Sequence, residues 1–180
     1  ERLRECGPVR RIGTGLEAAP CYLRAMDWML FLIFLVACAG AATTGAIFEP
    51  GSWYDELEKP GFTPPNWAFP VVWTTLYICI AVAAARAAPL DDSGYAMAFF
   101  AVQVAFNTLW TPVFFGRRNM KGGLMVIAVL WLAVAGTLWQ FWQLDWIAGA
   151  LFVPYLVWVS IAAALNFSVW RLNRNRPIAT

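Results

Sequence analysis

The sequence predicts an all-α membrane protein, a bundle of five transmembrane helices with a structured first loop acting as a lid. Of its 180 residues, 61% are hydrophobic and only 13% are charged, whereas about a quarter of residues in soluble proteins are charged. Five runs without charge account for this bias, each near the roughly 20 residues that a helix needs to cross a bilayer. The runs are Trp28 to Phe48, Asn66 to Ala85, Ser93 to Gly116, Gly122 to Leu144 and Trp146 to Trp170.

Residues 1–25 differ from the rest of the chain. They are basic, contain Gly and Pro, and have no apolar core of signal-peptide length. We expect this tail to be disordered and dispensable. The remaining domain, residues 26–177, is expected to contain helices at about 28–48, 67–87, 93–115, 122–144 and 146–171.

The loop after the first helix contains the segment "WYDELEKPGFTPPNW", Trp53 to Trp67, which is unusually aromatic for a solvated loop. Ser52 and the acids that follow it are typical of a helix start, and Pro60 ends that turn. The second half is stiff because proline fixes its own backbone and restricts the preceding residue. We therefore predict a lid across one end of the bundle, formed by Trp53, Leu57, Phe62, Pro64 and Pro65.

The second, third and fifth helices each combine aromatic with small or polar residues on one face. The second helix has Trp73 and Tyr77, and the fifth has Tyr155, Trp158, Ala162 and Asn166, with Leu165 beside them. The third has Gln103, Asn107, Trp110 and Phe114 on one face. Its opposite face carries the small residues Gly94, Ala98, Ala101 and Ala105. Such a stripe lets helices approach closely in lipid, so it predicts either a dimer seam or packing within one monomer.

The eleven tryptophans divide into two groups. We interpret Trp73, Trp110 and Trp158 as site residues because they share faces with polar partners. Those near the ends of spans are interpreted as interfacial anchors; they are Trp28, Trp139, Trp142, Trp146 and Trp170.

Several function classes are disfavoured by what the spans lack. The sequence has no histidine, and its four cysteines have no metal or redox spacing. The five runs contain no Asp, Glu, Lys, Arg or His, which disfavours retinal proteins and proton-coupled pumps. We expect no metal site, no obligatory cofactor and no nucleic-acid partner, and a binding chemistry of aromatic rings, amides and hydroxyls.

Basic residues predict the orientation in the membrane. Arg117, Arg118 and Lys121 precede the fourth helix, and Arg171, Arg174 and Arg176 end or follow the fifth. Both groups lie on the side of the aromatic loop, so the positive-inside rule favours a cytoplasmic C-terminus and first loop. Arg86 and the arginines of the tail lie on the other side and oppose this count. Whether the membrane is inner or outer is left open.

Three segments resemble the TspO/translocator-protein family, also called tryptophan-rich sensory proteins or peripheral benzodiazepine receptors. They are "WYDELEKPGFTPPNWAFPVVW", "FNTLWTPVFF" and "PYLVWVSIAAALNFSVWR", and the resemblance spans Met26 to Pro177. It implies a five-helix bundle, usually a homodimer, whose first loop covers a pocket. The family binds protoporphyrin IX, haem and aromatic ligands of the benzodiazepine or isoquinoline-carboxamide type, and animal members bind cholesterol. Some bacterial members are linked to light-dependent porphyrin breakdown and to regulation of tetrapyrrole synthesis, and outer-membrane members are reported.

By position, the family's pocket would include Tyr54, Trp67, Trp73, Asn107, Trp158 and Ala162, with Leu165 nearby. To these we add Trp110, which shares the face of Asn107. Two departures are evident. Gly61 stands where some bacterial relatives have Trp, and Phe167 stands where the sterol-recognition pattern has Tyr, a pattern weak even when complete.

Three hypotheses of function follow. The preferred one is a membrane binding or sensor protein for a porphyrin or another flat aromatic molecule. The second is a light-dependent porphyrin-degrading enzyme in which Trp73 and Trp158 are oxidised or relay electrons. The third is a facilitator of porphyrin, lipid or sterol movement, although no inverted repeat is evident in the sequence.

Overall fold

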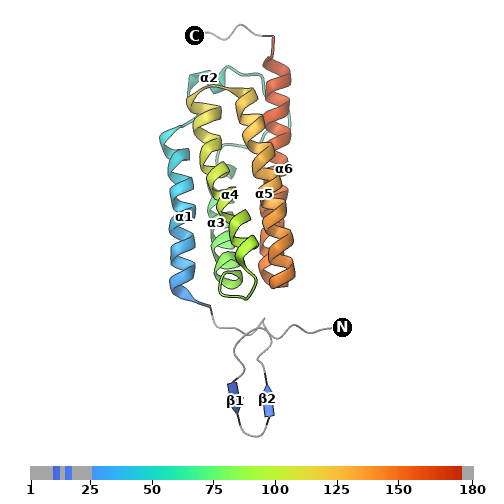
Figure 1. The fold of residues 1–180 in the computed structure, drawn as a ribbon. Helices are drawn as coiled ribbons and strands as arrows, with labels where there is room; N and C mark the ends of the chain where they lie inside the picture. Colours follow the sequence, from blue (N-terminus) through green and yellow to red (C-terminus); the bar gives the residue numbers. More distant parts are fainter. Residues whose placement is uncertain (1–9, 13–14, 18–25, 176–180) are drawn as a thin grey trace.

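The computed structural model describes residues 10–12, 15–17 and 26–175. Its main body is a bundle of parallel and antiparallel helices (Figure 1). Five helices are long and apolar enough to cross a membrane, as the sequence predicts. They are α1 (Trp28–Ile47), α3 (Ala68–Ala87), α4 (Gly94–Thr111, continued by a π-helical turn to Gly116), α5 (Met120–Leu144) and α6 (Trp146–Asn173).

Before the bundle, the strands β1 (Arg10–Ile12) and β2 (Gly15–Glu17) pair in antiparallel register. The sequence predicts that residues 1–25 are disordered. Apart from these two strands, that prediction concerns residues 1–9, 13–14 and 18–25, which lie outside the described residues.

Side-chain caps explain where several helices begin. The Asp27 carboxylate accepts hydrogen bonds from the amides of Met29 and Leu30 at 3.0 and 3.1 Å, which satisfies two free donors of α1. The Asn119 side chain caps α5 in a similar way, with Oδ1 accepting one hydrogen bond from the Gly122 amide at 2.9 Å. Because of this cap, α5 begins at residue 120, before the predicted start at residue 122.

The end of α4 differs from the prediction of a regular helix. Its last turn, Pro112–Gly116, is π-helical. Pro112 has no amide hydrogen and cannot donate the bond that would continue the α-helical pattern, and short π turns occur often at functional sites.

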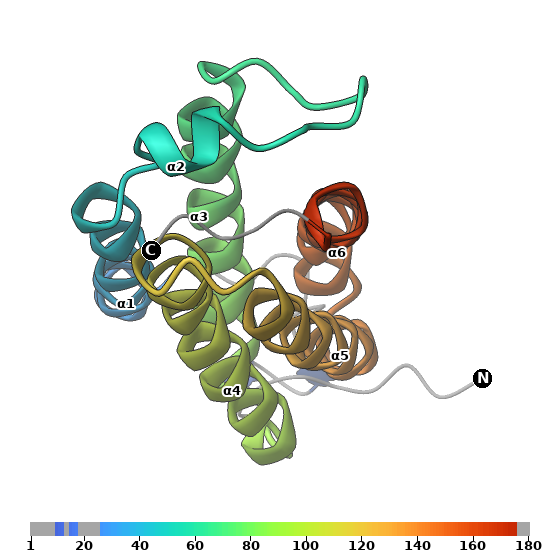
Figure 2. The same cartoon turned by 90° about the horizontal axis from the view of Figure 1, so that it is seen from above.

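The five helices form a closed ring in which the neighbours follow the order α1, α3, α6, α5, α4 (Figure 2). Part of the interior is filled by fully buried side chains. Phe141 and Phe152 meet edge to face at 5.0 Å, a pair worth about 0.5–1.5 kcal/mol beyond burial. Small residues between Ala81 and Ala87 on α3 are also buried and allow α3 to pack closely.

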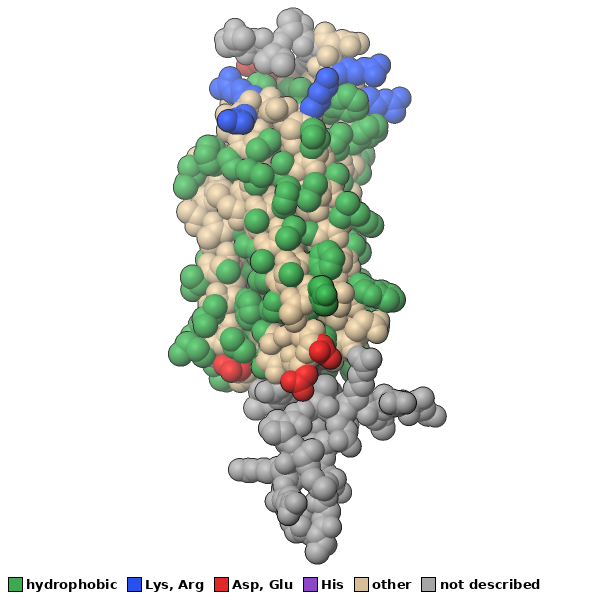
Figure 3. Space-filling model, in the orientation of Figure 1, with side chains coloured by type: hydrophobic (Ala, Val, Ile, Leu, Met, Phe, Trp, Pro, Cys, Tyr) green, Lys and Arg blue, Asp and Glu red, His purple; other side chains and the backbone are tan. Residues whose placement is uncertain are grey.

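The two ends of the bundle carry different charges. Figure 3 shows the lysine and arginine side chains gathered at the end where α6 finishes, where an acidic side chain is also visible, and only acidic charged side chains at the other end of this face. The exposed basic residues of the first end are Arg117, Arg118, Lys121, Arg171 and Arg174. At the acidic end, the Arg86 guanidinium on α3 pairs with Asp145, with Nε and Nη2 at 2.7 and 2.6 Å from Oδ2. Asp145 also caps α6 by accepting from the Ile147 amide at 2.8 Å.

Four of the predicted anchors are exposed near that acidic end, where α1 and α6 begin and α5 finishes. They are Trp28, Trp139, Trp142 and Trp146, with exposed fractions of 70, 64, 48 and 60%.

Candidate functional site

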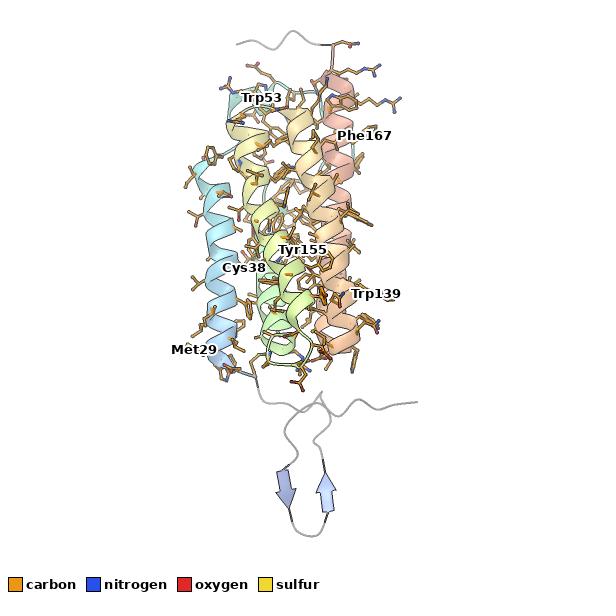
Figure 4. The ribbon with its side chains drawn as sticks, in the orientation of Figure 1. Met29, Cys38, Trp53, Trp139, Tyr155 and Phe167 are labelled. Carbon is orange, nitrogen blue, oxygen red and sulfur yellow. The ribbon has the colours of Figure 1, made fainter. Side chains whose placement is uncertain are left out.

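A layer of polar side chains lies inside the ring, where α3, α4 and α6 meet. Gln103 and Asn107 on α4 are 1 and 8% exposed. The Tyr155 hydroxyl on α6 donates to Gln103 Oε1 at 3.0 Å, and the Tyr77 hydroxyl on α3 lies beside the Asn107 carboxamide. We call these four residues the polar layer; Figure 4 shows Tyr155 near the middle of the bundle.

Aromatic rings lie between the polar layer and the basic end of the bundle. The indole of Trp73 stacks on Tyr77, with centroids 5.2 Å apart and planes at 29°, and it meets the ring of Tyr155 edge to face at 6.1 Å. On the facing helix, Trp158 contacts Phe69 edge to face at 5.7 Å. Both indoles are half-buried, so α3 and α6 present aromatic surface above the carboxamides of α4.

The first loop is fixed to the end of α4 by aromatic contacts. Its short helix α2 (Ser52–Asp55) begins one residue earlier than the sequence suggests, because Gly51 rather than Ser52 is the capping residue. The Trp53 and Tyr54 rings contact Phe114 at 5.9 and 6.3 Å. Tyr54 also contacts Phe115 at 5.3 Å. We call this contact between α2 and the π turn the aromatic anchor; Figure 4 labels Trp53 at this end.

The environment of Tyr54 changes its acidity. Its partial burial raises the pKa of the phenol above the usual range, and the neighbouring Asp55 carboxylate adds to the shift. The ammonium of Lys59 lies 4.6 Å from the centroid of the Tyr54 ring, in a cation–π contact.

A second attachment joins the loop to the end of α6. Asn173 is 2% exposed, and its Oδ1 accepts from the Glu58 amide at 3.0 Å while its Nδ2 donates to the Glu58 carbonyl at 2.9 Å. Its Nδ2 also donates to the carbonyl of Val169 at 2.8 Å. The side chain therefore pairs with both backbone groups of one loop residue, and we call this pairing the Asn173 bridge.

The rest of the loop, residues 59–67, passes over α3 toward α6 and returns to the start of α3 (Figure 2). Its backbone is held by local turns, such as the bond from the Thr63 amide to the Pro60 carbonyl at 3.0 Å. Phe62 and Trp67 are 55 and 69% exposed. We call residues 56–67 the strap.

The structure brings most of the predicted ligand-binding residues to one region. Trp73, Trp110, Trp158 and Ala162 all pack against the buried core, Asn107 is buried, and Leu165 is half-buried one turn beyond Ala162. Tyr54 lies at the aromatic anchor, whereas Trp67 lies apart on the outer surface.

The predicted lid and dimer residues are also placed. Of the lid residues, Trp53, Leu57 and Pro64 are half-buried, while Phe62 and Pro65 are exposed. All of the small residues predicted for a dimer seam are exposed on α4; they are Gly94, Ala98, Ala101 and Ala105.

Sequence reasoning did not select Gln103, Tyr77, Tyr155, Asn166 or Asn173 as site residues. The first four lie on the inward faces that periodicity identified, so this signal could have found them. Asn173 carries no such signal, because its partner Glu58 is 115 residues away in the sequence.

Some buried polar atoms near the aromatic rings make no hydrogen bond within the described part of the chain. They are Gln103 Nε2, Trp110 Nε1, and Nδ2 and Oδ1 of Asn166. A buried group of this kind costs about 1–3 kcal/mol when it is left unpaired. Unpaired buried groups are few in native structures, and each calls for an explanation such as strain, a catalytic role, or a bound water or ion.

Comparisons with known proteins agree on one family. The family model described as TspO/MBR family matches residues 29–171. A tryptophan-rich sensory protein of Cereibacter sphaeroides is 58% identical over 154 residues, covering 86% of this chain and 98% of that protein. Protein CrtK of Rhodobacter capsulatus is 54% identical over 152 residues, covering 82 and 95%. The human translocator protein is 30% identical over 157 residues, covering 83 and 93%.

Proposed function

Because this chain belongs to the TspO/MBR family and is an integral, multi-pass membrane protein, we propose that it is a membrane receptor for tetrapyrroles. Protoporphyrin IX or a haem-type porphyrin would bind between α3, α4 and α6, beneath the first loop. Aromatic ligands of the benzodiazepine-site type would compete for the same site. The receptor would act in the transport of tetrapyrroles or in the regulation of their synthesis.

The observation that carries this proposal is that two half-buried indoles on α3 and α6 pack against the same core as the buried carboxamide of Asn107 on α4. Trp73 and Trp158 offer ring surface from α3 and α6, and offset stacking on a macrocycle adds about 0.5–1.5 kcal/mol per pair. Asn107 supplies a polar group that can orient the ligand, as in other pockets that are apolar with few polar contacts. The loop, attached at both α4 and α6, would serve as the lid.

The distribution of charge suggests how a porphyrin would be oriented. Its two propionates are anionic, and the described residues at the end that carries the loop include six Lys and Arg against four Asp and Glu, with Arg117, Lys121 and Arg171 exposed. We therefore expect the propionates to face this end and the hydrocarbon edge to enter first. The same residues support a cytoplasmic location for this end.

A titration with protoporphyrin IX, followed by tryptophan quenching in detergent, tests the proposal. Wild type is expected to bind saturably in the micromolar range. Trp73→Phe, Trp158→Phe and Asn107→Ala should each weaken binding about fivefold to tenfold, the loss of one stacking contact or hydrogen bond.

Trp139→Phe is the matched control, because Trp139 is 64% exposed on the outer surface (Figure 4) and its loss should leave the affinity unchanged. Quenching that is linear in porphyrin, or equal in all variants, would mean that the rings only contact the membrane and the pigment dissolved in it.

One contact favours the light-dependent enzyme as a second candidate. The stacked pair of Trp73 and Tyr77 places two oxidisable rings in contact beside the proposed ligand. Repeating the titration under illumination tests this candidate: a spectral loss of bound pigment that disappears in Trp73→Phe would support it, and an unchanged spectrum would exclude it.

We also propose that the receptor is a homodimer that uses the small-residue face of α4. All of its four small residues are exposed, and small residues at exposed positions of a membrane helix allow a second helix to approach closely.

A further inference from the structure

Gln103 has one end of its amide paired and the other end free. Its side chain is 1% exposed, its Oε1 accepts from the Tyr155 hydroxyl at 3.0 Å, and its Nε2 makes no hydrogen bond within the described part of the chain. Reversing the amide would leave both Oε1 and the hydrogen of the Tyr155 hydroxyl without a partner, so the orientation in which Tyr155 donates to Oε1 and Nε2 stays free is favoured. With Tyr155 as a donor, two N–H groups are available at the centre of the bundle.

The Gln103 amide lies at the inner end of the candidate site, farthest from the first loop. Gln103 lies one helical turn before Asn107 on the same face of α4, and about 16 Å of helix separates it from Phe114 at the aromatic anchor. Its partner Tyr155 contacts Trp73 on one side and Phe152 on the other. Beyond this point the interior is apolar, with Phe152 and Phe141 in contact, so Gln103 belongs to the layer that closes the site.

The groups around this layer decide which acceptor could bind there. Its other members are Tyr77, Asn107 and Tyr155, all uncharged side chains. The arginine on α3, Arg86, is paired with Asp145 at the acidic end. A carboxylate at Gln103 would therefore be buried without a counter-charge, which is strongly unfavourable. A neutral acceptor has no such penalty and would satisfy the free donor.

We propose that Gln103 is a specificity-determining residue, donating from Nε2 to a neutral acceptor on the ligand. The acceptor would be a carbonyl oxygen or a pyridine-type ring nitrogen of an aromatic molecule. This inference rests on the proposed function, because it uses the same site. It divides the ligands into two groups. Aromatic carbonyl compounds depend on Gln103 for affinity, whereas a porphyrin reaches this layer with its hydrocarbon edge and needs no hydrogen bond from Gln103.

Two matched probes measure this donor directly. The first is a planar aryl ketone, and the second is its analogue with CH2 in place of C=O; protoporphyrin IX is the reference ligand. The variants are Tyr155→Phe, which keeps the Gln103 amide, and the same variant with Gln103→Met added. The double variant removes both hydrogen-bonding partners together, which is less destabilising than leaving a buried hydroxyl without its acceptor.

Wild type and Tyr155→Phe are expected to bind the ketone about fivefold or more tighter than the methylene compound, the value of one hydrogen bond. In the double variant the two probes should bind equally, and saturable binding of protoporphyrin IX should persist, which shows that the variant is folded. The carbonyl stretching frequency of the bound ketone should be lowered in wild type and return to its apolar-solvent value in the double variant.

Each contrary result has a separate meaning. If protoporphyrin IX fails to bind wild type saturably, the proposed function fails. If it binds but wild type shows no preference for the ketone, the role of Gln103 is overturned without any substitution. A ketone preference and a lowered frequency that persist in the double variant would also overturn it, and would assign the bond to Asn107 or to a bound water.

Discussion

Buried asparagines on α6 show how one residue type serves different purposes. Asn173 uses both ends of its amide, bonding to Glu58 and Val169. Asn166, two helical turns earlier, uses neither end within the described residues. An amide that is fully paired inside the protein fixes structure, whereas an unpaired one can bind a group from outside. At the scale of single residues, this difference separates the attachment of the loop from the candidate site.

Tyr54 gives a prediction that depends on pH. Because burial raises the pKa of its phenol in the folded protein, the unfolded chain releases this proton first as pH rises. Stability from Tyr54 is therefore complete below the ordinary tyrosine pKa of about 10 and is lost as pH rises through the higher pKa of the folded state.

Thermal unfolding in detergent between pH 9 and pH 11 checks this sign. The melting temperature of wild type should fall more steeply over this range than that of Tyr54→Phe, which has no proton to release. Parallel pH profiles would show that Tyr54 has no part in this loss.

At the scale of elements, the first loop differs from the long helices α1 and α3 that it joins, because it contains only the short helix α2 and turns. It is held by rings at one point and by an amide at another, while residues 60–67 of the strap are held by local turns. Such segments open with a lower free energy than the helices they join. The Asn173 bridge is the attachment with the clearest geometry, and removing it should free the strap without changing the bundle.

We expect Asn173→Ala to speed hydrogen exchange at the Glu58 amide, and to speed release of bound porphyrin, each by up to about thirtyfold. Its two bonds to Glu58 contribute roughly 1 kcal/mol each, and a factor of ten corresponds to about 1.4 kcal/mol.

Asn175→Ala is the matched control, because Asn175 is exposed at the same end of the molecule. Exchange and release rates that are equal in Asn173→Ala and Asn175→Ala would show that the bridge does not control the strap.

The helices themselves could be predicted from the sequence, because uncharged runs of sufficient length have no other stable arrangement in a bilayer. Periodicity also placed Asn107, Trp73 and Trp158 on inward faces. It could not provide the Asn173 bridge, since this pairing depends on how far α6 extends past the membrane and on where the loop returns. Nor could it reveal that Gln103 is half-paired, which depends on the hydroxyl of Tyr155 on another helix.

At the scale of the whole molecule, the outer surface of α4 makes a prediction about assembly. If the small-residue face is a dimer seam, leucines there would separate the two helices and remove the close packing that holds them. Ala101→Leu with Ala105→Leu should convert the dimer into a monomer in mild detergent, measured as the protein mass by light scattering.

Ala128→Leu on the exposed surface of α5 is the control and should leave the mass unchanged. A wild-type protein that is already monomeric, or a double variant of unchanged mass, would exclude this seam.

The ion pair between Arg86 and Asp145 bears on the direction in which a bound molecule can leave. It joins α3 to the junction of α5 and α6, its side chains are only 13 and 4% exposed, and breaking one partner of such a pair costs about 3–5 kcal/mol. The apolar packing of Phe141 and Phe152 lies between it and the polar layer. A ligand that arrives beneath the loop would therefore depart by the same opening, and net passage across the bilayer would require a second conformation in which α3 separates from α5 and α6.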